Sequence, residues 1–177
     1  MIGPTLTTER LILRPPAAED FPAFVEMMAH ESTRFIGGPM VPEVAWRAWA
    51  AIIGAWTLNG FSMFSVIERD TGKWIGRLGP WRPLGWPGDE VGWGLSEHAR
   101  GKGYATEGAA ATIDWAFDHL GWEDVIHTIG PENLASQAVA ARLGAVNRGP
   151  GTMPPPLEAW AVDIWGQTRD EWRARRR

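Results

Sequence analysis

Residues 100–105 read Arg-Gly-Lys-Gly-Tyr-Ala and carry the strongest functional signal in the chain. They lie between a predicted strand with two glycines, Gly92 and Gly94, and the start of a long predicted helix. Glycine lets backbone N–H groups come close to a ligand, and the start of a helix adds about half a positive charge. The stretch therefore predicts an anion site, for which a pyrophosphate is the natural occupant.

Three kinds of phosphate loop are candidates for this stretch, and the residues separate them. A Walker A loop ending at Lys102 needs Ser or Thr at the next position, which is Gly103. A Rossmann fingerprint that begins at Gly101 needs Gly or Ala where the chain has Thr106. What remains resembles the pyrophosphate signature of the GNAT superfamily of N-acetyltransferases, Gln/Arg-x-x-Gly-x-Gly/Ala, which Arg100, Gly103 and Ala105 satisfy. That pattern is short and can arise by chance, so the assignment of the loop depends on the rest of the sequence.

Outward from this loop, the periodicity of apolar residues predicts an α/β chain. Runs bounded by turn residues predict strands over residues 11–13, 61–68, 73–78, 90–95, 124–129, 145–147 and 159–165. Apolar residues at helical spacing predict helices that begin near residues 21, 42, 104 and 133. Asp70-Thr71-Gly72 closes the clearest hairpin, so the sheet cannot be purely parallel.

Four separate stretches, in the right order around residues 100–105, resemble the GNAT superfamily of N-acetyltransferases. The likeness is to its ribosomal-protein N-terminal (RimJ/RimL-like) branch. Residues 8–15 resemble the first strand of that branch, and residues 34–38 resemble its loop before the second helix. Residues 90–95 are similar to its fourth strand, and residues 131–145 to its Asn-x-x-Ser helix. The resemblance covers nearly the whole chain.

The resemblance implies a GNAT fold, in which a mixed, mostly antiparallel sheet of about six or seven strands is flanked by about four helices. The sheet splits into a V between its fourth and fifth strands, and the pantetheine arm of acetyl-coenzyme A lies in the cleft. A bulge at Trp93-Gly94 would leave backbone N–H groups free for this cosubstrate. The cofactor-binding residues implied are Trp93, Gly94, Leu95, Arg100, Gly101, Lys102, Gly103, Tyr104, Ala105, Asn133, Ser136 and Arg142.

Two residues are predicted to carry the catalysis. Glu90, at the start of the glycine-bearing strand, is placed to take a proton from the amine, directly or through water, although a surface carboxylate in a hairpin is the alternative. Many members of the superfamily protonate the departing sulfur with a tyrosine, but Tyr104 is the only tyrosine here and belongs to the phosphate loop. The substitute implied by the RimJ/RimL-like branch is Ser136, with water as the fallback. Asn133 and Ser136 are alternatively helix caps.

The substrate side is less defined. His30, Arg34 and Phe35 are candidates to contact the acceptor. No histidine has a second ligand at metal spacing, so no metal site is predicted. The chain has 12 tryptophans, which are expected to pack in the core, with a minority lining an acceptor pocket.

Composition limits the partners. A formal net charge of −4 argues against nucleic-acid and membrane partners and slightly favours a cationic acceptor. Without cysteine there is no acyl-cysteine intermediate and no disulfide. The expectation is one cytoplasmic domain, residues 1–177, which acts as a monomer or small homo-oligomer. Its basic C-terminal end, with Arg173, Arg175, Arg176 and Arg177, is expected to be a solvated terminus.

These observations predict direct transfer of an acetyl group from acetyl-coenzyme A to an amine. Two alternatives stay open: a non-catalytic acyl-coenzyme A binding module, and a nucleotide-binding enzyme that uses the same glycine-rich loop. The acceptor is not defined by the sequence. A protein N-terminus, a free amino acid, an aminoglycoside-like amine and a polyamine all fit.

Overall fold

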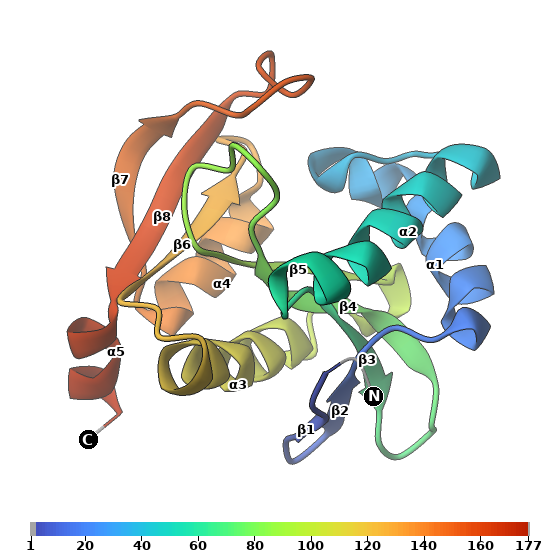
Figure 1. Ribbon diagram of the computed structural model, residues 1–177, viewed down its shortest axis with the longest axis horizontal. Helices are drawn as coiled ribbons and strands as arrows, with labels where there is room; N and C mark the ends of the chain where they lie inside the picture. The colour runs from blue at the N-terminus through green and yellow to red at the C-terminus, as the bar shows by residue number, and fades with distance from the viewer. Residues whose placement is uncertain (1–2, 177) are drawn as a thin grey trace.

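A computed structural model describes residues 3–176, which form an eight-stranded sheet with helices on both faces (Figure 1). The strand order is β1-β2-β3-β4-β5-β6-β8-β7. The strands are β1 (Leu6–Thr7), β2 (Leu11–Arg14), β3 (Phe64–Glu68), β4 (Trp74–Trp81), β5 (Glu90–Leu95), β6 (Asp124–Ile129), β7 (Val146–Gly151) and β8 (Val162–Thr168). The α/β class and the mixed, mostly antiparallel sheet predicted from the sequence are confirmed.

The sheet is split between β5 and β6. Every other neighbouring pair is antiparallel, whereas β5 and β6 run parallel and pair only at Glu90 and Ile126. Beyond this pair the strands diverge, which gives the predicted V. The strand count is one higher than the upper expectation because β1 is a two-residue strand paired with β2, too short to show an alternating pattern.

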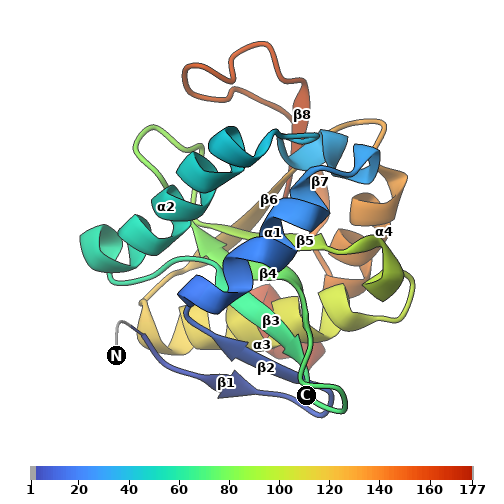
Figure 2. The ribbon, with the colours of Figure 1, turned by 90° about the vertical axis from the view of Figure 1, so that its right-hand side faces the viewer.

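Helices cover the sheet in layers. Helices α1 (Phe21–Met28) and α2 (Pro42–Asn59) lie on one face, and α3 (Tyr104–His119) lies on the other (Figures 1 and 2). Helix α4 (Leu134–Leu143) packs beside α3 and β6. Three short 3₁₀ segments, Ala18–Asp20, Glu31–Ile36 and Glu97–Ala99, complete the regular structure described.

The core has one part on each face. Under α3, apolar side chains of β2, β3 and β4 pack against Ile113 and its helical neighbours. Under α1 and α2, Phe24 stacks on Trp49 with ring centroids 4.7 Å apart. Trp56 of α2 is buried and donates its indole N–H to the Met63 carbonyl at 3.1 Å. The hydrogen bond of Trp56 holds α2 to the residue that precedes β3.

The C-terminal end is solvated on its basic side, as expected, but it forms a helix. Residues Arg169–Arg175 form α5, which begins with a capping box between Thr168 and Glu171. Trp172 is only 4% exposed and donates to Asp114 Oδ1 at 2.7 Å. The indole anchors the terminal turns on α3. Arg173, Arg175 and Arg176 are exposed to solvent, as expected, but Arg173 and Arg175 belong to a helix rather than to a loose end. Arg177 lies outside the described residues.

Two other features of residues 3–176 bear on the predictions. Within this range no helix has the length and apolar content that a membrane crossing requires. Nor do His, Asp or Glu side chains gather there in a group that could hold a metal ion.

Candidate active site

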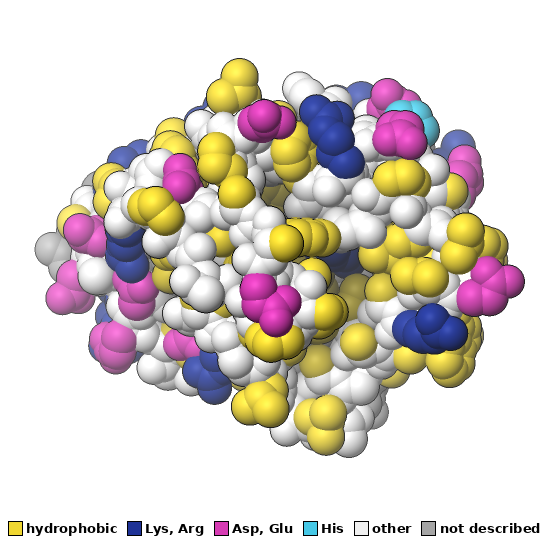
Figure 3. All heavy atoms as spheres, turned by 90° about the horizontal axis from the view of Figure 1, so that it is seen from above, with side chains coloured by type: hydrophobic (Ala, Val, Ile, Leu, Met, Phe, Trp, Pro, Cys, Tyr) yellow, Lys and Arg dark blue, Asp and Glu magenta, His cyan; other side chains and the backbone are white. Residues whose placement is uncertain are grey.

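A cavity of about 620 Å³ opens beside the split in the sheet. Its walls come from β4, β5, β6, α1, α2 and the loop between β7 and β8, and most of the side chains are apolar. Figure 3 looks down on this face, where hydrophobic side chains surround a hollow between two lobes of the molecule. The charged side chains in the cavity wall, among residues 3–176, are Arg34, Arg77 and Glu90.

The predicted phosphate loop lies at the start of α3. Gly101 and Gly103 have φ values of +73° and +83°, a region that favours glycine, and residues 101–103 are exposed. The N–H of Glu107 makes the first α-helical bond of α3, to Gly103 O at 3.0 Å. The N–H groups before it have no partner within a helix and can face an anion.

Neighbouring side chains hold this loop in place. Arg10 donates to Glu107 Oε2 at 2.6 Å and to the Lys102 carbonyl at 2.9 Å. Arg100 donates to the Leu95 carbonyl at 3.0 Å, and Tyr104 donates to Glu68 at 2.6 Å. The predicted cofactor residues Arg100 and Tyr104 are therefore engaged within the protein. Backbone N–H groups and the exposed Lys102 remain for a phosphate.

The backbone of β5 has an open side. The carbonyl of Val91 accepts from His127 Nδ1 and that of Leu95 accepts from Arg100, both on the side away from β4. Because the two sides of a strand alternate, Trp93 also presents its backbone there, whereas Gly94 faces β4. The β4–β5 register is continuous over residues 90–95. The expected bulge at Trp93-Gly94 was wrong, and divergence of β6 frees the groups instead.

The two glycines of β5 allow close packing. A Cβ on Gly94 would lie 2.7 Å from Ile36 Cδ1, and one on Gly92 would lie 3.0 Å from Met63 Cε. Both contacts are closer than normal van der Waals distance. Because they lack side chains, Gly92 and Gly94 let Met63 and Ile36 pack directly against the β5 backbone, on the face of the strand that also carries Glu90.

Glu90 lies in the cavity wall and is 6% exposed. Its carboxylate accepts hydrogen bonds from the Trp86 indole and from the Thr128 hydroxyl, the latter at 3.0 Å. Burial raises the pKa of Glu90 from its ordinary 4.5 to about 7, against the lowering effect of these hydrogen bonds and of the Arg77 charge. A carboxylate with this pKa is suited to accept a proton near neutral pH.

The raised pKa of Glu90 predicts a pH-dependent stability difference for Glu90→Gln. The folded protein binds this proton more tightly than the unfolded chain, so its stability falls as the pH rises from about 4.5 to about 7. Glutamine lacks this loss, and we expect the variant to gain about 1–3 kcal/mol over the parent at pH 8 relative to pH 4.5. Urea unfolding of both proteins at both pH values measures the difference in unfolding free energy between variant and parent. The same difference at pH 4.5 and at pH 8 would contradict a raised pKa for Glu90.

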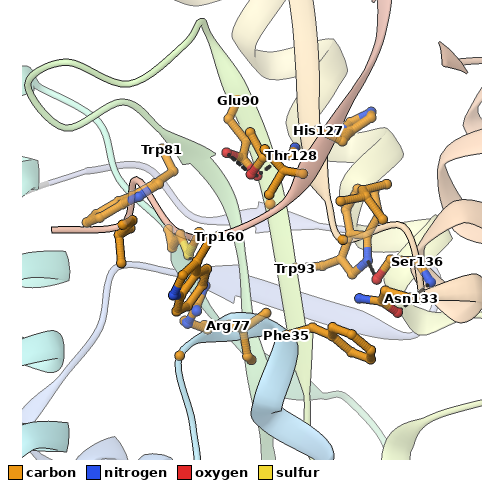
Figure 4. Close-up of a pocket in the computed structure, with 18 of the residues that line it drawn as sticks. Phe35, Arg77, Trp81, Glu90, Trp93, His127, Thr128, Asn133, Ser136 and Trp160 are labelled. Carbon is orange, nitrogen blue, oxygen red and sulfur yellow. Dashed lines mark hydrogen bonds between the residues drawn. The ribbon is translucent and has the colours of Figure 1, made fainter. Parts of the chain in front are cut away.

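On the other side of β5, Trp93, Asn133 and Ser136 form a group (Figure 4). The indole of Trp93 donates to Ser136 Oγ at 3.2 Å, which leaves the serine proton free to donate elsewhere. Asn133 Oδ1 accepts from the Ser136 N–H at 3.2 Å and so caps α4. Arg142, predicted to bind the cofactor, is exposed in the last turn of α4 and does not line the cavity.

The predicted acceptor residues divide between two places. Arg34 and Phe35 line the cavity, and the Arg34 guanidinium lies over the Phe35 ring at 4.4 Å. His30 does not line the cavity, because its ring pairs with Glu97 at 2.9 Å and caps the segment Glu31–Ile36. Buried His127 also lines the cavity, and burial lowers its pKa to about 4, so it is neutral at pH 7.

Sequence reasoning missed several residues of the cavity. Arg77 and Thr128 each alternate with apolar neighbours, which is typical of outward-facing positions on a strand. The β4–β5 register and the divergence of β6 turn them toward the cavity instead. Trp160 lies in the β7–β8 loop, where no periodicity exists to place it. Trp81, Trp86 and Trp93, grouped near the sheet in the sequence, do line the cavity.

Comparison with protein families gives one match over most of the chain. A family model described as an acetyltransferase (GNAT) domain matches residues 10–146. The uncharacterized N-acetyltransferase YnaD of Bacillus subtilis (strain 168) is 26% identical over 170 residues, which cover 94% of this chain and 98% of that protein.

Solved structures agree with this match. An acetyltransferase from Agrobacterium tumefaciens str. C58 is 33% identical, with a TM-score of 0.82 and coverage of 94% of this chain and 95% of that chain. Mycobacterium smegmatis RimJ, in complex with CoA-disulfide, has a TM-score of 0.71 at 19% identity and covers 91% of this chain and 83% of its own. The second likeness is one of fold.

Proposed function

The chain belongs to the GNAT acetyltransferase family, as its resemblance predicted, and we propose that it transfers the acetyl group of acetyl-coenzyme A directly to a primary amine within one ternary complex. The observation that carries the proposal is Glu90, a buried carboxylate with a pKa of about 7 in the cavity wall. We further propose that residues 1–177 act as one domain, alone or in a small homo-oligomer, without nucleic acid.

The described residues fit acetyl-coenzyme A at both ends. The exposed glycines of residues 100–105 and the start of α3 would hold the pyrophosphate, with Lys102 adding charge. The open backbone side of β5 at Trp93 would bind the pantetheine amides and the thioester carbonyl. Such backbone donors stabilise a developing oxyanion by a few kcal/mol, about 3 in typical cases.

The transfer itself needs two proton movements. The amine nitrogen attacks the thioester carbon, the C–S bond breaks, and coenzyme A leaves as a thiolate. Glu90 takes the proton lost by the amine, and the Ser136 hydroxyl gives a proton to the sulfur. Afterwards Glu90 releases its proton to solvent and Ser136 takes one from solvent, so both residues return to their starting forms. Tyr104 cannot supply that proton, because its hydroxyl donates to Glu68.

We expect Ser136→Ala to lower kcat by about 10-fold or more while changing the KM for acetyl-coenzyme A by less than about threefold. The hydroxyl acts on the leaving sulfur, which develops charge only in the transition state. Steady-state kinetics measure both constants, and Ala135→Ser provides a control on the exposed neighbouring position. An unchanged kcat in Ser136→Ala would remove the serine from the mechanism.

A thiol-release assay over a panel of amines tests the function as a whole. Turnover of acetyl-coenzyme A that depends on an added amine, with acetylated amine as the product, supports the proposal. Tight binding of acetyl-coenzyme A without turnover across the panel would instead favour a non-catalytic binding module.

A further inference from the structure

The cavity continues past Glu90 into a compartment away from the Trp93–Ser136 group. In Figure 4, Arg77, Trp81 and Trp160 lie on one side of Glu90, and Trp93, Asn133 and Ser136 lie on the other. Trp81 and Trp160 lie on this side of Glu90, and the lining of the cavity as a whole is mainly aromatic or apolar, with Met63, Trp86, Met153 and Leu157 among its residues. Such a lining fits the large apolar part of a small molecule better than an extended polar chain.

Arg77 is the arginine labelled on this side of Glu90 in Figure 4, and the exposed Arg34 is the other arginine of the cavity wall among the described residues. Arg77 stands opposite Gly94 in the β4–β5 register, so its side chain is on the same face of the sheet as Trp81 and Glu90. Its Nη1 donates to Met63 Sδ, a weak acceptor, and its buried Nε has no hydrogen-bond partner. Within residues 3–176, no carboxylate lies within salt-bridge distance of Arg77.

A guanidinium in an apolar wall needs an anion. Removal of a cation from water without a partner is costly, and its five N–H donors are suited to a planar carboxylate. Glu90 is the carboxylate near enough to affect the pKa of Arg77, but the two side chains form no salt bridge. The compartment therefore offers donors that the described side chains do not use.

We infer that Arg77 binds the carboxylate of the acceptor, and that the acceptor is an α-amino acid with an aromatic or large apolar side chain. This inference rests on the proposed function. An α-amino acid carries its amine and its carboxylate on one carbon, so a single molecule can present the amine to Glu90 and the carboxylate to Arg77. Its side chain then packs among Trp81, Trp86 and Trp160.

The same charges disfavour cationic acceptors. A polyamine, an aminoglycoside or a lysine side chain would bring further positive charge next to Arg77, in a low-dielectric wall where like charges repel strongly. The net charge of −4 favours cations at the surface of the protein, but it does not describe this compartment. The local arrangement decides which amine can enter.

Matched acceptor pairs test the inference on the unmodified protein. The pairs are L-tryptophan with tryptamine, L-phenylalanine with 2-phenylethylamine, and L-leucine with 3-methylbutylamine, which differ only in the carboxylate. We expect kcat/KM, measured by thiol release, to be about 10- to 100-fold higher for each carboxylate-bearing member, as a charge-assisted pair provides. Spermidine and a short peptide with a free N-terminus complete the panel.

The substitution Arg77→Met then locates the effect. At pH 9, where Glu90 is ionised with or without the Arg77 charge, it should remove most of the 10- to 100-fold preference by raising KM for the amino acids. The kcat/KM of the amines that lack a carboxylate should then change by less than about threefold. Arg77→Lys keeps the positive charge but loses the paired N–H donors of the guanidinium, so it should keep part of the preference for carboxylate-bearing acceptors. Arg47→Met, on an exposed position of α2 outside the cavity, is the matched control and should retain it fully.

The outcomes separate this inference from the proposed function. If Arg77→Met slowed both members of each pair equally while acetyl-coenzyme A still bound in calorimetry, Arg77 would not recognise the acceptor carboxylate and the inference would be overturned. A preference of the unmodified protein for the decarboxylated amines, for spermidine or for the peptide would overturn it as well. No turnover with any amine would overturn the proposed function, and the inference with it.

Discussion

Gly103→Glu is expected to abolish measurable binding of acetyl-coenzyme A, with at least about a 100-fold rise in Kd. Position 103 has a φ of +83°, which strains any residue other than glycine. The new side chain would start 3.3 Å from Arg10 Nη2, the arginine that holds the loop at Lys102. Its carboxylate would also place a negative charge where the phosphates need N–H donors. Isothermal titration calorimetry measures the loss.

A matched control separates this effect from general strain. Gly121 follows the far end of α3, has a φ of +69°, and has open space around its Cβ position. Gly121→Glu therefore introduces the same side chain and a similar backbone strain away from the loop, and should bind acetyl-coenzyme A normally. Unchanged affinity in Gly103→Glu, with Gly121→Glu also normal, would show that the phosphates bind elsewhere.

Glu90→Gln is expected to lower kcat by about 10²- to 10³-fold, as loss of a general base does in other enzymes. In the parent, only the ionised carboxylate can take the proton, so the rate should rise with pH up to the pKa of Glu90, about 7, and then level. The glutamine variant has no titrating group at this position, so its remaining activity should lose that acid limb. Steady-state rates from pH 5.5 to 9 measure both effects.

Asp89→Asn is the control for this prediction. Asp89 precedes Glu90, pairs with Arg82 outside the cavity wall, and is more exposed. Its neutralisation should leave the acid limb in place, because a surface ion pair contributes little, about 0–1 kcal/mol. If Glu90→Gln retained the acid limb at the same pH, another group would be the base and Glu90 would only shape the cavity.

The parts of the fold that depend on local signals could be predicted from the sequence. Gly101 and Gly103 mark the phosphate loop because few other residues tolerate a positive φ, and the apolar stripe beginning at Tyr104 marks α3 because its period is helical. Glu90 was singled out by its place at the start of a glycine-bearing strand. Each of these signals is contained within a short stretch of sequence, so none of them depends on how the strands pair.

The acceptor compartment could not be predicted in the same way. Arg77 reaches the cavity only because β4 and β5 pair in one particular register, and Thr128 reaches Glu90 only because β6 runs parallel to β5 at one point. Trp160 is brought in by a loop without regular structure. Trp172 anchors α5 on Asp114 of α3, 58 residues earlier in the chain, and no local sequence pattern predicts this contact. Long-range pairing, rather than residue type, sets these positions.

The single pairing of β5 with β6 holds the two strands together at one end of the cleft. Glu90 lies at the paired position and accepts a hydrogen bond from Thr128 of β6, so both strands fix its position. Leu95 and Ile129 lie beyond the pairing, where no bridge joins the two strands. In the proposed function, the open end would admit the long pantetheine arm without displacing Glu90. Entry of the cosubstrate and positioning of the proton acceptor would then fall at opposite ends of the cleft.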